Sequence, residues 1–159
     1  MDAAPMLGSS LPQAMGRFAG RAFQLRGRAS RSEYWWWMLV NVVVLATTQL
    51  LIPALLWGRT PQPTLFVGPF GSALFANVEL FNLQLTDAPG SPFAAFSLLI
   101  AGLWLIVTIV PGFTVAVRRL HDSNLSGWWV LLAIVPPGPF VLILLATRRP
   151  RAEGARFDT

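Results

Sequence analysis

The sequence has no cysteine and no lysine, and only 12% of its 159 residues are charged. The missing cysteines exclude disulfide bonds and thiolate metal sites. Soluble domains carry about a quarter charged residues. A chain that is 54% hydrophobic and holds seven tryptophans is therefore expected to lie in a membrane. Its net charge of +5 comes from arginines that flank the apolar runs, which favours contact with anionic headgroups over nucleic-acid binding.

Three long apolar runs set the expected architecture. A helix of about 20 apolar residues crosses a bilayer, and residues 34–57 and 92–117 each exceed that length without any charge. Residues 128–146 form a third run, which the sequence PPGP interrupts at 136–139. This run permits one kinked crossing or a re-entrant dip, and it is too short for two crossings. We therefore predict a single all-α membrane domain with three hydrophobic membrane helices, the third kinked or re-entrant.

Four further segments surround these runs. Residues 11–24 place apolar side chains at helical spacing beside arginines, which predicts an interfacial amphipathic helix in the headgroup layer. Residues 58–91 are a connector rich in proline and glycine, and we expect a surface or interfacial element there. An additional span in this connector would bury Glu79 at a cost of about 2.5 to 3.5 kcal/mol, which disfavours it. Residues 118–127 are a polar connector, and residues 147–159 are a basic tail.

Arginine counts indicate the orientation through the positive-inside rule. With three crossings and a cytoplasmic N-terminus, seven arginines lie inside and five outside; with a re-entrant third run, eleven lie inside and one outside. The charges therefore favour two crossings, while the lengths permit three, and the side of the tail stays open. In both cases two crossings return the chain to its starting side. We expect the start of the first run and the end of the second to share one interface.

Two polar motifs should meet at that interface, GRASRSEYWWW at 27–37 and RRLHDSNLSGWW at 118–129. Each combines arginines, one acid and tryptophans, which gather where aromatic belts lie. Together they resemble the signatures of the YhaH/YhaI-like family of small bacterial inner-membrane proteins of unknown function, over about residues 11–157. The resemblance implies a multi-pass protein of the inner membrane and no particular activity. The candidate lipid-headgroup or partner interface comprises Gly27, Arg28, Arg31, Glu33, Tyr34, Trp35, Arg118, Arg119, His121, Asp122, Ser126, Gly127, Trp128 and Trp129.

The sequence departs from this family in two places. The connector at 58–91 looks like an insertion. The tail has Ala155 and Asp158 where the family usually ends on an Asn-containing motif closed by glycine.

Residues of the two motifs suggest structural roles first. Ser30 and Glu33 have capping-box spacing, which predicts the start of the first transmembrane helix. Arg118, His121 and Asp122 share one face if the second helix extends that far. His121 beside Asp122 is compatible with catalysis, but no motif places a serine or cysteine nucleophile, and one histidine does not supply the usual ligands of zinc. We expect an ion-pair network rather than an enzyme, with no cofactor and no metal.

The motifs hold four arginines and two acids. Pairing the acids leaves about two arginines available, and a guanidinium binds phosphate through two parallel hydrogen bonds. The nearest anion at a membrane surface is a lipid phosphate. We therefore predict contact with membrane lipids, principally anionic ones.

Polar or small side chains form a stripe on each of the two long runs. Polar residues in a membrane helix are expected to bond to another helix, and small residues let helices approach closely. We expect these faces to pack together, or to line a pore in a homo-oligomer. The residues are Asn41, Thr48 and Gln49 in the first run and Ser97, Ala101, Thr108, Gly112 and Ala116 in the second.

Three classes of function follow from these features. The sequence favours a small scaffold or accessory protein whose interface contacts anionic lipid or a protein partner. An alternative is a subunit of a transporter or channel, which would need oligomers and a water-accessible face at Asn41 and Gln49. A third is a membrane enzyme that acts on a lipid or peptide through His121 and Asp122. The sequence specifies no ligand, partner or biological process.

Overall fold

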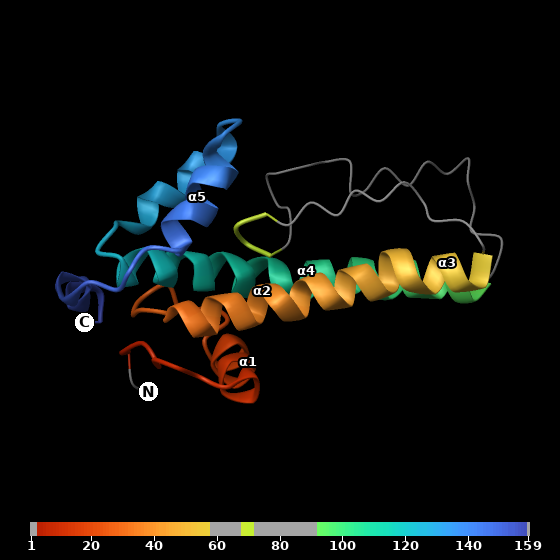
Figure 1. Ribbon diagram of the computed structural model, residues 1–159, viewed down its shortest axis with the longest axis horizontal. Helices are drawn as coiled ribbons and strands as arrows, with labels where there is room; N and C mark the ends of the chain where they lie inside the picture. The colour runs from red at the N-terminus through yellow and green to blue at the C-terminus, as the bar shows by residue number, and fades with distance from the viewer. Residues whose placement is uncertain (1–2, 58–67, 72–91, 159) are drawn as a thin grey trace.

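The computed structural model describes residues 3–57, 68–71 and 92–158. Within these residues the chain is helical and contains no strand, as the sequence predicted. Figure 1 shows two long helical segments side by side, with a short helix against one end and a hairpin of shorter helices standing off that same end. Both termini also lie there. The elements are α1 (Leu11–Gly20), α2 (Arg31–Ala46), a π-helical turn (Thr47–Leu51), α3 (Ile52–Trp57), α4 (Pro92–Asp122), the 3-10 helix η3 (Gly127–Ile134), α5 (Gly138–Ala146) and the 3-10 helix η4 (Ala152–Phe157).

The first long segment begins with the predicted capping box. The hydroxyl of Ser30 accepts a hydrogen bond from the amide of Glu33 at 3.2 Å, and the Glu33 carboxylate accepts one from the amide of Ser30 at 2.6 Å. This reciprocal pair satisfies amides that a helix start leaves without partners. From there α2, the π-helical turn and α3 follow one another directly to Trp57. The stretch Arg31–Leu56 is long and apolar enough to cross a membrane.

The second long segment, α4, has 31 residues and also contains a stretch long and apolar enough to cross, Ala95–Asp122. It extends through residues 118–122, which we had assigned to a polar connector. The helix continues because its first stop signal is Asn124, whose φ of 60° is left-handed. The amides of Asn124 and Leu125 then bond to the carbonyls of His121 and Leu120 at 2.9 and 3.0 Å. These two bonds form a Schellman motif, a common way to close a helix.

The third apolar run folds back on itself instead of continuing as one kinked helix. It forms η3, turns at residues 135–137, and returns as α5, which packs against η3. A Cβ on Gly138 would lie 1.5 Å from the carbonyl oxygen of Leu132, so only glycine fits at this approach. Both ends of the hairpin lie at the end of α4. A Cβ on Gly127 would lie 3.2 Å from Nε2 of His121, and the carbonyl of Ala146 accepts a hydrogen bond from Nε of Arg119.

Helix α1 packs against protein, which the prediction of a headgroup-bound face did not anticipate. The ring of Phe18 stacks on the ring of Trp37 in α2, with centroids 3.9 Å apart, and Ala14 is also buried. The flat indole of Trp37, itself 0% exposed, gives this face an apolar partner inside the protein. The helix ends at Gly20, earlier than predicted, and Phe23 beyond it is 83% exposed.

The polar side chains of the two long segments form two kinds of hydrogen bond. The side chain of Asn41 links three parts of the fold, since its amide nitrogen donates to the carbonyl of Gly71 and its oxygen accepts from Trp104 of α4 at 2.9 Å. Thr48 and Thr108 instead donate to carbonyls of their own helices, at 2.8 and 2.7 Å. The expectation that Thr48 bonds to a neighbouring helix is therefore wrong, because its hydroxyl reaches the carbonyl one turn back.

The small residues on α4 lie inside the fold, but one of them accommodates a turn rather than a helix. A Cβ on Gly112 would lie 2.1 Å from the carbonyl oxygen of Phe70. Residues 68–71 are buried between α2 and α4, where the hydroxyl of Tyr34 donates to the carbonyl of Pro69 at 2.6 Å. Of the other predicted packing residues, Gln49 is half-buried, and the buried ones are Ser97, Ala101 and Ala116. The interfacial element expected in the connector lies outside the described residues.

Candidate functional site

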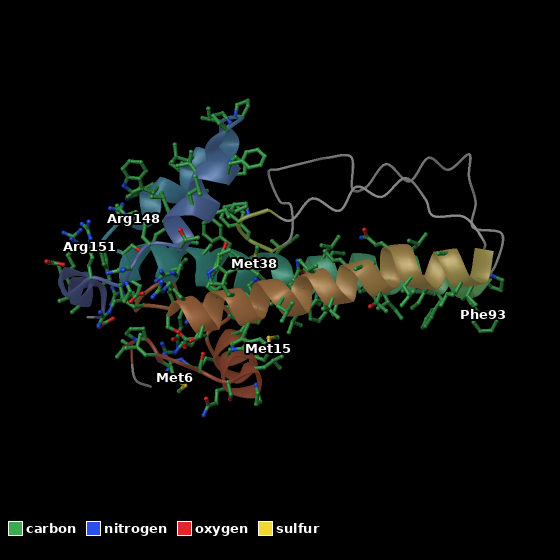
Figure 2. The ribbon with its side chains drawn as sticks, in the orientation of Figure 1. Met6, Met15, Met38, Phe93, Arg148 and Arg151 are labelled. Carbon is green, nitrogen blue, oxygen red and sulfur yellow. The ribbon has the colours of Figure 1, made fainter. Side chains whose placement is uncertain are left out.

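Hydrogen bonds join the two polar motifs at one end of the long helices. The amide of Ala29 donates to the carbonyl of Arg118 at 3.0 Å, and Nδ1 of His121 lies 3.2 Å from the carbonyl oxygen of Gly27. The last turns of α4 therefore lie against the segment that leads into α2. We call this region, formed by residues 17–33, 118–129 and 146–158, the polar end. Figure 2 shows Arg148 and Arg151 there, and Phe93 at the opposite end of the long helices.

Arg119 holds the hairpin to α4. It is 1% exposed, and its Nε donates to the carbonyl of Ala146 at 2.8 Å. Its two terminal nitrogens donate to the carboxylate of Asp122 and to the carbonyl of Arg148. The planar guanidinium thus bonds at once to Asp122 of its own helix and to two carbonyls at and just beyond the end of α5, a geometry that a lysine cannot reproduce. Arg119 belongs to the predicted lipid-headgroup or partner interface, and each of its three nitrogens donates to a group of the protein.

His121 is also held by protein contacts. Its ring lies parallel to the ring of Phe157, with centroids 4.1 Å apart and an angle of 6° between the planes. Because a carbonyl only accepts, the contact with Gly27 requires the proton on Nδ1. No carboxylate bonds to this ring among the described residues, and those residues contain no group of three His, Asp or Glu side chains placed to hold a metal ion. The arrangement is that of a packed, oriented histidine.

The tail supplies contacts that the sequence analysis missed. Nε and a terminal nitrogen of Arg28 donate to the carboxylate of Asp158, at 2.9 and 2.6 Å. This hydrogen bonding raises the pKa of Arg28. The amide of Gly27 donates to the carbonyl of Phe157 at 2.7 Å. A signal for this pairing was present in the sequence, since Asp158 is an acid in a basic tail.

Glu33 pairs with an arginine that precedes both motifs. Its side chain is 4% exposed and forms an ion pair with Arg17 of α1, while its other oxygen caps α2 at Ser30. A terminal nitrogen of Arg17 also donates to the carbonyl of Ala4 at 2.7 Å. Each acid of the motifs therefore has an arginine partner, and α1 supplies one of them.

Two arginines of the motifs form no ion pair with the described residues, Arg31 and Arg118. Arg31 is exposed and lines a cavity of about 330 Å³ together with Ser30 and Ser32. Arg118 is only 2% exposed, and its Nε has no hydrogen-bond partner in the part of the chain that the structure describes. Buried donors without an acceptor are uncommon in proteins. Among the arginines of the two motifs, these two therefore keep a positive charge that no described acid pairs with.

The remaining interface residues divide into buried and exposed sets. Tyr34 is buried, and Gly127 lies so close to α4 that a Cβ there would be 2.9 Å from Val117. Ser126 accepts from the amide of Trp128 at 3.4 Å and so caps η3. Three tryptophan rings near the polar end are exposed, namely Trp35 at 39%, Trp128 at 78% and Trp129 at 47%.

Comparisons with known proteins identify the family of this chain. A family model for proteins of unknown function (DUF805) matches residues 22–159. Inner membrane protein YhaH of Escherichia coli (strain K12) is 27% identical over 120 residues, which cover 76% of this chain and 71% of YhaH. Inner membrane protein YhaI of the same organism is 50% identical over 34 residues, which cover 21% of this chain and only 29% of YhaI. No solved structure matches the chain.

Both relatives are inner membrane proteins, and two helical segments of this chain are long and apolar enough to cross a membrane. The family match covers most of the sequence, including both polar motifs and the tail. The chain therefore belongs to the DUF805 family of proteins of unknown function, as the resemblance of its two motifs to the YhaH/YhaI-like family predicted.

Proposed function

We propose that this protein is a small inner-membrane scaffold or accessory protein whose polar end binds the phosphates of anionic lipids. The proposal rests on the observation that some arginines of the polar end pair with acids and others do not. Glu33, Asp122 and Asp158 each have an arginine partner, whereas Arg31 and Arg118 form no ion pair with the described residues. A guanidinium binds phosphate through parallel hydrogen bonds, and lipid phosphates are the anions present at the depth where these residues would lie.

The proposed arrangement has two crossings and a cytoplasmic N-terminus. The segment 31–57 and α4 cross the bilayer, and the η3–α5 hairpin re-enters from the cytoplasmic side. Exposed apolar side chains along both long segments, such as Val43 at 54% and Ile106 at 64%, support contact with lipid. The arginine count supports the same topology, since eleven arginines then lie inside and one outside. The exposed rings of Trp128 and Trp129 suit the aromatic belt.

The experiment uses the purified full-length protein in neutral detergent micelles, titrated with phosphatidylglycerol or phosphatidylcholine. Native mass spectrometry counts the bound lipids. Changing both Arg31→Gln and Arg118→Gln should reduce binding of the anionic lipid by about fivefold for each arginine, since one arginine near an anionic surface contributes about 1 kcal/mol. Binding of phosphatidylcholine should stay the same.

Arg59→Gln is the control for net charge, because it removes one positive charge, half of what the double variant removes, from the connector between the two proposed crossings. It should leave binding of phosphatidylglycerol unchanged. A loss per removed arginine that is equal in Arg59→Gln and in the double variant would reduce the effect to net charge and would reject the proposal.

A pore along the Asn41 face is not proposed. Asn41 is 0% exposed, and both ends of its amide bond to protein, one to Gly71 and the other to Trp104. Catalysis through His121 is not proposed either, because its ring is held by Gly27 and Phe157.

A further inference from the structure

We infer that residues 22–26, which we call the anchor loop, form a second membrane contact, in which Phe23 and Leu25 enter the acyl chains of the leaflet at the polar end. The inference rests on the proposed crossing of the bilayer by α4. It goes beyond the lipid-phosphate contacts proposed above, because the anchor loop would bind the apolar part of the lipid.

Contacts with both long segments fix the level of the anchor loop along the helices. The hydroxyl of Thr114 in α4 lies at hydrogen-bond distance, 3.0 Å, from the carbonyl oxygen of Ala22. Thr114 precedes Asp122, the last residue of α4, by eight positions, which is about 12 Å of helix. On α2, Phe18 stacks on Trp37, which lies about 9 Å from the start of that helix. Both contacts therefore place α1 and the anchor loop roughly two turns inward from the helix ends.

This level coincides with the edge of the hydrocarbon if α4 crosses a bilayer. The 31 residues of α4 extend over about 46 Å, whereas the hydrocarbon of a bilayer is about 30 Å thick. A centred helix then extends about 8 Å beyond the hydrocarbon at each end. Thr114 would lie about 4 Å inside the hydrocarbon, level with the outermost acyl carbons. Helices that lie in this interface bury their apolar faces to about 5 to 10 Å, so the anchor loop reaches a comparable depth.

The outer surface of α1 and the anchor loop is uncharged. Phe23 is 83% exposed and Leu25 is 48% exposed. None of the exposed residues from Leu11 to Leu25 carries a charge, because Arg17 is half-buried and Arg21 is buried. Soluble domains carry about a quarter charged residues, and most of these lie on the surface. This surface therefore suits acyl chains better than water.

A positive charge lies at the edge of this apolar surface. Arg26 is exposed, and it lines one cavity of about 330 Å³ together with Phe23 and Leu25. Arg26 forms no ion pair with the described residues. An anionic lipid has the complementary arrangement, since its negative headgroup lies directly outward of its acyl chains. Apolar surface, depth and charge thus favour lipid as the occupant.

The inferred contact differs from the interfacial helix that the sequence predicts. Such a helix turns its arginines to the headgroups and its apolar side chains to the lipid. In the structure, Arg17 and Phe18 of α1 instead face protein, where they contact Glu33 and Trp37. Contact with the acyl chains then falls to the loop that follows α1.

The test uses the absence of cysteine, which lets one spin label report the depth of one position. The full-length protein is placed in discs of equal parts phosphatidylcholine and phosphatidylglycerol. The accessibility of each label to oxygen, which concentrates in hydrocarbon, is compared with its accessibility to a water-soluble nickel chelate. Labels at Phe23→Cys and Leu25→Cys should favour oxygen. Val107→Cys, which is 69% exposed in α4, should favour oxygen most, and Glu153→Cys in the exposed tail should favour the chelate.

A second variant separates insertion of the loop from insertion of the label. In the protein labelled at Leu25→Cys, adding Phe23→Ser should make the label at least about threefold more accessible to the chelate, because serine lacks the apolar surface of phenylalanine. Adding Ile106→Ser instead removes an exposed apolar side chain of α4 and should leave the accessibility unchanged. Thermal unfolding in neutral detergent should be the same for both, since both side chains are exposed.

The outcomes separate this inference from the proposed topology. A label at Phe23 that favours the chelate as strongly as one at Glu153, while Val107 favours oxygen, would overturn the anchor loop and leave the crossing of α4 standing. A label at Val107 that also favours the chelate would overturn both. A label at Phe23 that neither reagent reaches would show a protein partner in place of lipid and would also overturn the inference.

Discussion

Arg119 and Asp122 form an ion pair that is almost inaccessible to water, with side chains 1% and 0% exposed. Taking charges out of water is costly, and their mutual attraction offsets that cost only while both partners are present. Asp122→Asn should therefore destabilise the protein by about 3 to 5 kcal/mol, measured by denaturant unfolding in detergent. Glu153→Gln removes an exposed acid of the tail and should change stability by less than about 0.5 kcal/mol. Similar losses in the two variants would contradict the assignment of Asp122 to a buried pair.

Arg28 and Asp158 form a more accessible pair, with side chains 14% and 21% exposed. Solvent screens such a pair, so its net contribution should be smaller than that of Arg119 with Asp122. A double-mutant cycle with Arg28→Gln and Asp158→Asn should give a coupling energy of about 0.5 to 1 kcal/mol in unfolding experiments. Raising the salt concentration should reduce this coupling. Strictly additive effects would show that the tail is not held through this contact.

At the residue scale, the sequence identified charged residues of the polar end but not which of them pair with one another. The Ser30–Glu33 capping box was predictable, because its spacing is local. The choice of Arg17 for Glu33, and of Asp158 for Arg28, depends on how distant segments fold back. Arg28 and Asp158 are 130 positions apart, and no local pattern encodes such a contact.

At the scale of elements, the two long helical segments followed from uninterrupted apolar runs, whereas the path of the third run could not be predicted. A kinked crossing and a folded-back hairpin satisfy the same composition and the same break at proline and glycine. The contacts that distinguish them come from elsewhere in the chain. Arg119 bonds to Ala146, and Gly138 permits the two arms to approach closely.

Substitution of two glycines in α4 tests the close packing of this helix against the turn at residues 68–71. At Gly112 an added Cβ would lie 2.1 Å from the carbonyl of Phe70, whereas at Gly102 it would meet nothing within 4 Å. Gly112→Ala should therefore destabilise the fold by about 1 to 3 kcal/mol through overpacking. Gly102→Ala should leave stability unchanged or raise it by up to about 1 kcal/mol, as expected for alanine in a helix. Thermal unfolding of both variants in one detergent makes the comparison. Equal effects on stability would contradict the close packing of Gly112 against Phe70.

At the scale of the whole molecule, the absence of cysteine makes the proposed topology directly measurable. Single cysteines can be placed at Gln24 and Glu153, which are exposed at the polar end, and at Phe93, which is 70% exposed at the far end of α4. A membrane-impermeant thiol reagent applied to intact spheroplasts should label only Phe93→Cys. Gln24→Cys and Glu153→Cys should react only after the membrane is opened. Labelling of Gln24 and Glu153 from opposite sides would replace the re-entrant hairpin with a third crossing.

The turn at residues 68–71 lies between the two long segments in the chain, and in space it contacts both of them. A ribosome therefore delivers this turn after α2 and before α4. Its contacts with α2, through Tyr34 and Asn41, can form on the half-made protein, and they create the surface that later receives Gly112. The order of synthesis thus allows this turn to pack against α2 before α4 has been made.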